Sequence, residues 1–205
     1  MTTLPPYSRI AVLGGGAWGT ALALASIAAG RDTILWARED DVVKDIAQTG
    51  ENKRFLPGVT LPKSLRVTGV LAEAARADAM LLVTPAQVLA DFAHMLAPLV
   101  APGAPLVICA KGIEKETGLL LNEVLAKAVP LATPAILSGP SFARDVAKGL
   151  PTAVTIAAPG ETAARLQASL SSPSFRPYAS DDMTGVALGG AAKNVYAIAC
   201  GIVEG

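Results

Sequence analysis

The chain has 205 residues, of which 52% are hydrophobic and 17% are charged, and its 17 Lys and Arg residues balance its 17 Asp and Glu residues. This composition is too apolar for an intrinsically disordered chain. The balanced charge lacks the basic excess of a duplex nucleic-acid binder or of a protein held on a membrane surface. The sequence therefore predicts a globular protein with no nucleic-acid partner.

The cysteines and the most apolar segment bear on the compartment. Residues 1–9 show no basic segment followed by an apolar one, so we expect no signal peptide and a cytoplasmic protein. Cys109 and Cys200 lie in apolar stretches, and we predict reduced core thiols, with no disulfide framework and no metal site. The apolar tract over 186–203 carries Lys193 and Asn194 at its centre, where an ionisable group is costly in lipid. We predict a buried helix there and no insertion into a membrane.

Strand-like apolar runs alternate with segments of helical spacing along most of the chain. A strand over 9–13 and three glycines lead into a helix over 17–29, and a second strand over 33–36 completes a βαβ unit. Because the strands are almost continuously apolar and helices separate them, the sequence predicts a mainly parallel sheet covered on both faces. Further strands are expected at 79–83, 105–109 and 135–138, and further helices from Asp40 or Asp41 to Gln48, at 87–96 and at 119–128.

The alternation loosens after Gly139, where elements at 141–148 (helix), 152–157 (strand), 162–170 (helix) and 175–178 (strand) are expected to extend the sheet. Residues 52–62 are polar, contain proline and show no periodicity, which indicates a functional loop. Residues 183–205 form a pattern that is apolar nearly all round a helix, which predicts burial on all sides. We therefore expect a domain over 1–182, followed by one long helix over 183–205. Such a helix needs a partner, so we expect either the front part of a longer protein or a homodimer formed through this helix.

Residues 14–19, Gly-Gly-Gly-Ala-Trp-Gly, match the pattern G-x-G-x-x-G between the first expected strand and helix. Glycines here permit a tight turn and let backbone N–H groups approach a pyrophosphate at the helix N-terminus. The preceding strand, the following helix and the second strand ending at Trp36 favour a dinucleotide site over an ordinary glycine-rich turn. The predicted fold class is α/β: a Rossmann-type, doubly wound, mainly parallel sheet, followed by one long helix.

Arg38 follows the second strand, where an NAD-preferring unit usually places an acidic residue for the ribose 2′-hydroxyl. A cation in this region suits the 2′-phosphate of NADP. The alternative is a solvated arginine paired with Glu39 or Asp40. The cofactor prediction is therefore NADPH/NADP first, with NADH/NAD tolerated.

Three further segments carry polar residues at places where chemistry is expected. Lys111 follows the strand at 105–109, at the sheet edge where doubly wound domains bind ligands, although a surface lysine fits the position equally well. Residues 138–143, Ser-Gly-Pro-Ser-Phe-Ala, end the next strand, and Ser141 is expected to begin a helix able to receive an anion, with a simple helix cap as the alternative. Lys193 interrupts an apolar helix, and a lysine kept from water there is suited to general acid–base work, unless its stem carries the charge to the surface. His94, the only histidine, is expected to be a solvated surface residue.

Together these segments resemble one family, the bacterial-type NAD(P)-dependent glycerol-3-phosphate dehydrogenases. In the order of the chain, the matching segments are Gly14–Ala23, Trp36–Arg38, Asn52–Pro62, Val83–Gln87, Lys111–Glu114, Ser138–Ala143 and Gly190–Tyr196. The resemblance implies reversible hydride transfer between NAD(P)H and a small-molecule substrate, dihydroxyacetone phosphate, giving sn-glycerol 3-phosphate for phospholipid synthesis.

The resemblance also implies roles for individual residues. Lys193 would exchange the proton at the C2 oxygen and touch substrate, and Lys111 would contact both substrate and cofactor. The remaining substrate contacts would be Gly139 and Ser141, and the remaining cofactor contacts Gly14, Gly16, Ala17, Trp18, Gly19, Arg38 and Ala143. Because the family continues into a helical domain that completes the site, the resemblance implies that 183–205 is the first long helix and the start of an otherwise absent helical domain. We therefore expect the 205 residues alone to bind NADPH but to react slowly. The alternatives are a non-catalytic dinucleotide-binding module and a related reductase of a keto acid or nucleotide sugar.

Overall fold

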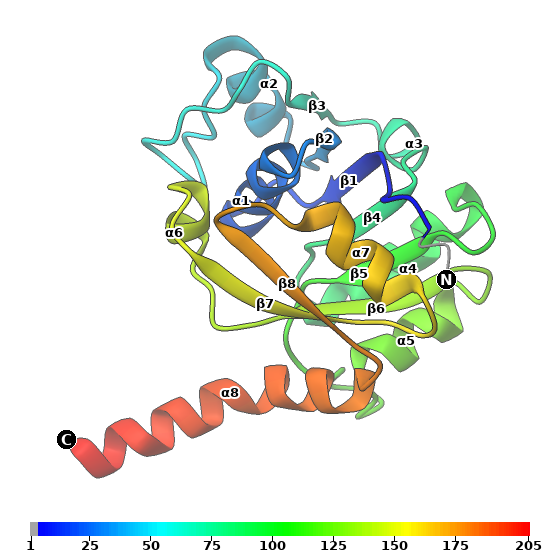
Figure 1. The fold of residues 1–205 in the computed structure, drawn as a ribbon, viewed down its shortest axis with the longest axis vertical. Coiled ribbons are helices and arrows are strands. Elements are labelled where there is room, and N and C mark those ends of the chain that lie inside the picture. The colour runs from blue at the N-terminus through cyan, green and yellow to red at the C-terminus, as the bar shows by residue number, and fades with distance from the viewer. Residues whose placement is uncertain (1–3) are drawn as a thin grey trace.

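A computed structural model describes residues 4–205, and its strands form one eight-stranded sheet in the order β3-β2-β1-β4-β5-β6-β7-β8. Figure 1 shows the sheet running through the body of the molecule, with helices packed along it. The strands are β1 (Arg9–Leu13), β2 (Asp32–Trp36), β3 (Arg66–Thr68), β4 (Ala79–Leu82), β5 (Pro105–Ile108), β6 (Thr133–Ser138), β7 (Thr152–Ala157) and β8 (Phe175–Ser180). The helices are α1 (Ala17–Ala28), α2 (Asp40–Thr49), α3 (Leu71–Ala74), α4 (Leu89–Leu96), α5 (Leu121–Ala128), α6 (Ala143–Ala147), α7 (Thr162–Leu170) and α8 (Met183–Glu204), with short 3-10 turns η1 (Ala86–Val88) and η2 (Ala97–Leu99).

The sheet is parallel except where β6 pairs antiparallel with β7. Strand β1 is central, pairs with β2 on one side and β4 on the other, and both pairings are parallel. The chain therefore winds outward in one direction through β2 and β3 and in the other through β4, β5 and β6. The predicted doubly wound, mainly parallel sheet is confirmed, and the crevice between the ends of β1 and β4 is the switch point where such sheets bind ligands.

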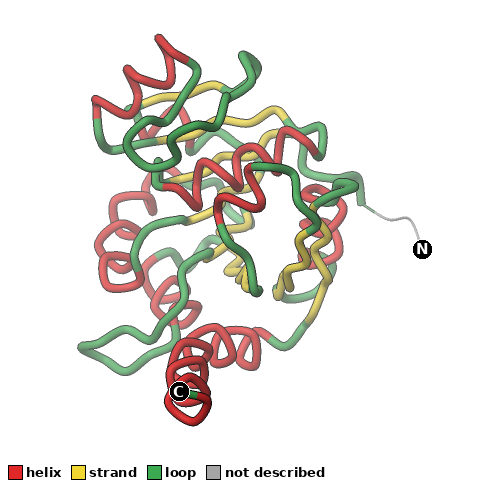
Figure 2. The backbone as a smooth tube through the Cα atoms, turned by 90° about the vertical axis from the view of Figure 1, so that its left-hand side faces the viewer, coloured by secondary structure: helices red, strands yellow, loops and turns green. Residues whose placement is uncertain are grey.

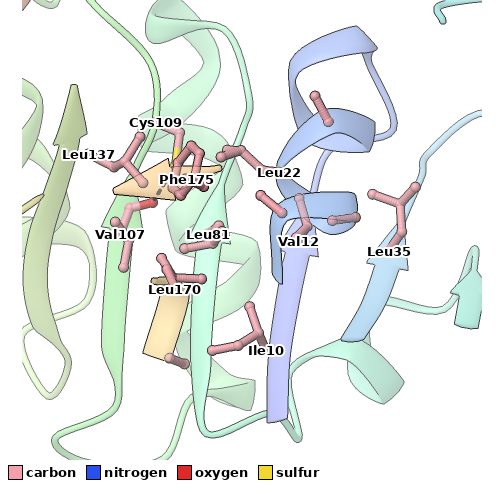
Figure 3. Close-up of a cluster of buried hydrophobic side chains, with 14 of the residues drawn as sticks. Ile10, Val12, Leu22, Leu35, Leu81, Val107, Cys109, Leu137, Leu170 and Phe175 are labelled. Carbon is pink, nitrogen blue, oxygen red and sulfur yellow. Dashed lines mark hydrogen bonds between the residues drawn. The ribbon is translucent and has the colours of Figure 1, made fainter. Parts of the chain in front are cut away.

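Two buried clusters lie on opposite faces of the sheet. Ile10 and Val12 of β1 belong to one cluster and Ala11 and Leu13 to the other, because successive residues of a strand point to opposite faces. The first cluster, drawn in Figure 3, receives side chains from α1, α6, α7 and the start of β8. The second receives side chains from α3, α4 and α5. The prediction of a sheet covered on both faces is therefore correct.

The expectation of burial all round the last helix is wrong. The N-terminal half of α8 packs on α5, β6 and β7, whereas its C-terminal half projects away from the sheet in Figures 1 and 2. The large apolar side chains of that half are between 65% and 87% exposed; they are Val195, Tyr196, Ile198, Ile202 and Val203. An apolar pattern shows what a helix is able to bury, but burial itself requires a neighbouring surface. Within residues 4–205 no single helix is long and apolar enough to span a membrane, and the two halves of α8 meet the length and composition criteria only as a pair bent by 42°.

Two smaller expectations also need correction, and two short elements were missed. Cys109 is buried, as predicted, and burial raises the pKa of its thiol, but Cys200 lies on the exposed part of α8. Helix α6 begins at Ala143 with Phe142 as its N-cap, two residues later than expected, so Ser141 lies in the preceding turn. The short strand β3 and helix α3 were not anticipated, because three and four residues are too few to show a periodicity.

Candidate functional site

The glycine turn after β1 is built at the switch point and needs its glycines. Gly14 has φ +137°, and a Cβ added there would lie 2.5 Å from the carbonyl oxygen of Val83, which follows β4. A Cβ on Gly19 would lie 1.8 Å from the carbonyl oxygen of Gly14. The Gly14 N–H donates to the Trp36 carbonyl at 3.0 Å, which ties the turn to the end of β2. Two of the three motif glycines are therefore required by the close packing of β1, α1 and β4.

The third motif glycine, Gly16, has a different environment. It is the N-cap of α1, makes no side-chain capping bond, and a Cβ on it would meet no atom of the described residues within 4 Å. The first turn, which includes the half-buried Ala17 and Trp18, has no acidic residue to occupy the end of the helix dipole. The first N–H groups of a helix lack partners within the helix. The turn thus offers free donors, positive potential and open space, which is what an anionic pyrophosphate requires.

Arg38 follows β2 at the same edge of the sheet. Its side chain is 83% exposed and pairs with Glu39 at 3.2 Å, so the ion pair considered as the alternative to phosphate binding is present. An exposed pair of this kind contributes little free energy, about 0–1 kcal/mol. Arg38 is therefore free to exchange Glu39 for a doubly charged ligand at small cost.

A cavity of about 260 Å³ lies next along the carboxyl edge and contains two lysines. Lys111 comes from the loop after β5, and Lys193 comes from α8. Gly190 lets α8 approach closely, because a Cβ there would lie 2.9 Å from Ser138 Oγ and 3.6 Å from Lys111 Cγ. The other lining residues come from the end of β6, from β7 and from α8: Ser138, Gly139, Pro140, Thr155, Gly185, Val186 and Gly189.

The two ammonium groups influence one another. Burial and, after it, the positive charge of Lys193 lower the pKa of Lys111 below the ordinary value for lysine. Lys193 is itself exposed, contrary to the expectation of a lysine surrounded by apolar side chains, and its Nζ lies 5.9 Å from the centre of the Phe142 ring, a cation–π contact. Two positive charges sharing a cavity without a carboxylate among its lining residues favour an anionic ligand.

The turn after β6 has both a packing role and an unused polar group. A Cβ on Gly139 would lie 3.0 Å from the Ala153 carbonyl oxygen, so glycine is needed there for the approach of β7. Ser141 Oγ is buried and has no hydrogen-bond partner among the described residues. Ala143 begins α6 and packs against the first buried cluster. A buried hydroxyl without a partner costs free energy unless a ligand or water satisfies it, so Ser141 is suited to contact a bound molecule.

The sequence did not single out two polar residues in the segment that follows β4, Thr84 and Gln87. Thr84 Oγ1 is buried without a partner among the described residues, directly after a fully buried strand. Gln87 donates from Nε2 to the Ile113 carbonyl at 3.0 Å and accepts the Lys115 N–H at 2.9 Å, so it fixes the loop that follows Lys111. A polar residue immediately after an apolar strand was the available signal for Thr84, whereas the partners of Gln87 lie 26 and 28 residues away. His94 is exposed on α4, as predicted.

Comparison with known proteins identifies the family of this chain. Residues 9–164 match the family model described as NAD-dependent glycerol-3-phosphate dehydrogenase N-terminus. The chain is 58% identical to glycerol-3-phosphate dehydrogenase (NAD(P)+) of Parvibaculum lavamentivorans, over 97% of this chain and 60% of that protein. It is 60% identical to the protein of the same name from a Bradyrhizobium species, over 97% of this chain and 61% of that protein.

A solved structure gives the same result. The crystal structure of glycerol-3-phosphate dehydrogenase from Coxiella burnetii superimposes with a TM-score of 0.88 at 36% identity, covering 97% of this chain and 61% of that one. The chain thus spans about three fifths of the length of these relatives. It belongs to the NAD-dependent glycerol-3-phosphate dehydrogenase family.

Proposed function

We propose that this chain binds NAD(P)H at the glycine turn and dihydroxyacetone phosphate in the two-lysine cavity, and takes part in the reversible formation of sn-glycerol 3-phosphate. The observation that carries the proposal is the shared cavity of Lys111 and Lys193, which lies at the same sheet edge as the glycine turn. A phosphorylated substrate placed there meets two cations, and a dinucleotide on the neighbouring turn lies beside it. The names of the relatives support the same substrate and cofactor.

In this proposal the glycine turn holds the dinucleotide phosphates. Gly14 and Gly19 let the backbone close, Gly16 leaves room, and the N–H groups of the first turn, at Ala17 and Trp18, face the negative charge. Arg38 binds the 2′-phosphate and makes NADPH the preferred cofactor, with NADH tolerated. Ala143 and Lys111 complete the cofactor contacts. The bound dinucleotide supplies the hydride chemistry.

The substrate side is proposed to use Lys111, Gly139, Ser141 and Lys193. Lys111 holds the anionic substrate, and Ser141 Oγ, which has no partner among the residues that the structure describes, donates to it. Lys193 gives its proton to the C2 oxygen as negative charge develops there, and takes it back in the reverse direction. Its contact with the Phe142 ring restrains a long side chain that is otherwise exposed, which reduces the entropy lost on reaching the substrate.

The test combines binding with turnover in wild-type chain and Lys193→Met. Calorimetry with NADPH should show binding that Lys193→Met leaves unchanged, because the lysine lies in the substrate cavity. Absorbance at 340 nm with dihydroxyacetone phosphate should show slow turnover in the 205-residue chain, which Lys193→Met lowers by about 10²–10⁴-fold. Lys127→Met, an exposed lysine on α5, is the matched control and should change neither.

Two outcomes would contradict the proposal. No binding of NADPH by the wild-type chain would remove the dinucleotide site. Binding of NADPH with no turnover of this substrate would instead support the alternative of a non-catalytic dinucleotide-binding module, and turnover of a keto acid or nucleotide sugar in its place would support a related reductase. Equal turnover of Lys193→Met and wild type would remove Lys193 from the reaction.

A further inference from the structure

Asn52 is a buried polar residue that the proposed function does not use. It begins the loop over 52–62 and is 1% exposed. Its Nδ2 donates to the Gly15 carbonyl at 2.8 Å and to Thr20 Oγ1 at 2.8 Å, and its Oδ1 accepts the Phe55 N–H at 3.2 Å. The side-chain amide thus uses its nitrogen as a donor twice and its oxygen as an acceptor. Two of its three partners, Gly15 and Thr20, belong to the glycine turn and the first turn of α1.

The bond to Gly15 controls the direction of one peptide unit. The Gly15 carbonyl and the Gly16 N–H belong to the same peptide, and the described part of the chain contains no cis peptide bond. In a trans peptide the C=O and N–H point in opposite directions. Because Asn52 holds the carbonyl on the buried side, the Gly16 N–H points away from Asn52. Within the described part of the chain, a Cβ on Gly16 would meet nothing within 4 Å, so this residue borders open space.

Asn52 is itself held in place by the loop. Its own carbonyl accepts the Leu56 N–H at 2.9 Å, and Oδ1 is fixed by Phe55 as described above. Arg54 bonds to Asp41 of α2 at 3.0 Å, which ties the same loop to the helix after β2. Thr20 Oγ1 also donates to the Gly16 carbonyl at 2.9 Å, which belongs to the next peptide unit and not to the one that carries the Gly16 N–H. The amide therefore meets the turn in a single prearranged orientation.

We propose that Asn52 is a positioning residue of the dinucleotide site, whose amide fixes the Gly15–Gly16 peptide so that the Gly16 N–H faces the bound pyrophosphate. The proposal rests on dinucleotide binding at the glycine turn. An N–H donor that is already fixed needs no reorganisation when the ligand binds. A peptide that is free to rotate must be ordered on binding, and the free energy of this ordering lowers the affinity for the ligand. Asn52 acts through Gly16 and touches no reacting atom.

The test compares Asn52→Asp with wild type and with Thr20→Val. The aspartate keeps the size of the side chain, but its carboxylate accepts only and repels the Gly15 carbonyl. Thr20→Val removes the second partner of the amide and leaves its bond to Gly15 intact. Calorimetry is carried out with NADPH, with ADP-ribose, which retains the pyrophosphate, and with 2′-AMP, which lacks it.

We expect Asn52→Asp to weaken NADPH and ADP-ribose by about tenfold or more, the effect of losing a well-placed hydrogen bond to a charged group, and to leave 2′-AMP within about twofold. Thr20→Val should change all three by less than about threefold. Equal weakening of all three ligands by Asn52→Asp would overturn the proposal, because Asn52 would then only support the fold. Unchanged affinities would overturn it as well.

A measurement on the wild-type chain covers the case in which Asn52→Asp does not fold. The amide resonance of Gly16 should show one of the largest shifts when inorganic pyrophosphate is added, and a Gly16 amide that does not respond would refute the proposal. Failure of the proposed function gives a different result, since the wild-type chain would then bind neither NADPH nor ADP-ribose.

Discussion

Substituting Gly19 by alanine should distort the glycine turn that is proposed to hold the dinucleotide. The added Cβ would lie 1.8 Å from the Gly14 carbonyl oxygen, where ordinary contact begins at about 3.4 Å, so the backbone must move by more than 1 Å. That carbonyl cannot give way easily, because the Gly14 N–H is bonded to Trp36 and a shift toward β4 meets Val83. Forced overpacking of this kind costs about 3 kcal/mol, at the upper end of the usual range. For a chain of this size it lowers Tm by about 6–12 °C.

Gly16→Ala is the matched control, with the same methyl group added three residues earlier. None of the residues described by the structure lies within 4 Å of its Cβ, so we expect the free energy of unfolding to fall by less than about 1 kcal/mol, the cost of alanine at an N-cap. NADPH affinity should nevertheless fall by at least about tenfold, because the methyl group occupies space proposed for the pyrophosphate. Thermal unfolding and calorimetry on both variants separate the two effects. The reasoning fails if Gly19→Ala melts at the wild-type temperature, or if Gly16→Ala binds NADPH as wild type does.

Three further predictions concern charge. Lys193→Met should raise the pKa of Lys111, because burial and the neighbouring ammonium both lower it and the variant removes the ammonium; a carbon-detected NMR titration that shows no rise would contradict this. Arg38→Asp should shift preference from NADPH toward NADH, measured by titrating both cofactors, and an unchanged affinity ratio would leave Arg38 with only its bond to Glu39. Asp78→Asn should cost about 1 kcal/mol at pH 7, a discounted value because the pair with Arg9 is partly exposed. Burial acts to raise the pKa of Asp78, but the hydrogen bonds from Arg9 hold that pKa below its ordinary value. The stabilisation by the Asp78–Arg9 pair is therefore present above about pH 4 and is lost as the pH falls through the pKa of Asp78 in the folded state. Urea unfolding of wild type and Asp78→Asn at pH 7 and in strong acid checks this prediction. A difference in the free energy of unfolding that persists in strong acid would refute the assignment.

Local patterns of residues were enough to predict the elements whose structure depends on neighbours in the chain. An apolar run followed by glycines and a helical spacing specifies β1, the turn and α1, because strand, tight turn and helix each depend on residues within a few positions of one another. The same holds for β4, β5 and β6, whose continuous apolar character also predicted burial on both faces. Lys111 and the turn at Ser138 were placed at one edge because the carboxyl ends of parallel strands share it.

Other features were decided only by tertiary structure, since they depend on segments far apart in the chain. Asn52 meets Gly15 across 37 residues, and no local spacing signals that contact. Strand β7 runs antiparallel to β6, a direction that an alternating pattern does not encode. Lys193 lies by the ring of Phe142, and the large apolar side chains of the C-terminal half of α8 are exposed. Amino-acid pattern determines what a segment is able to bury or bond, but the fold determines which surfaces and partners lie within reach.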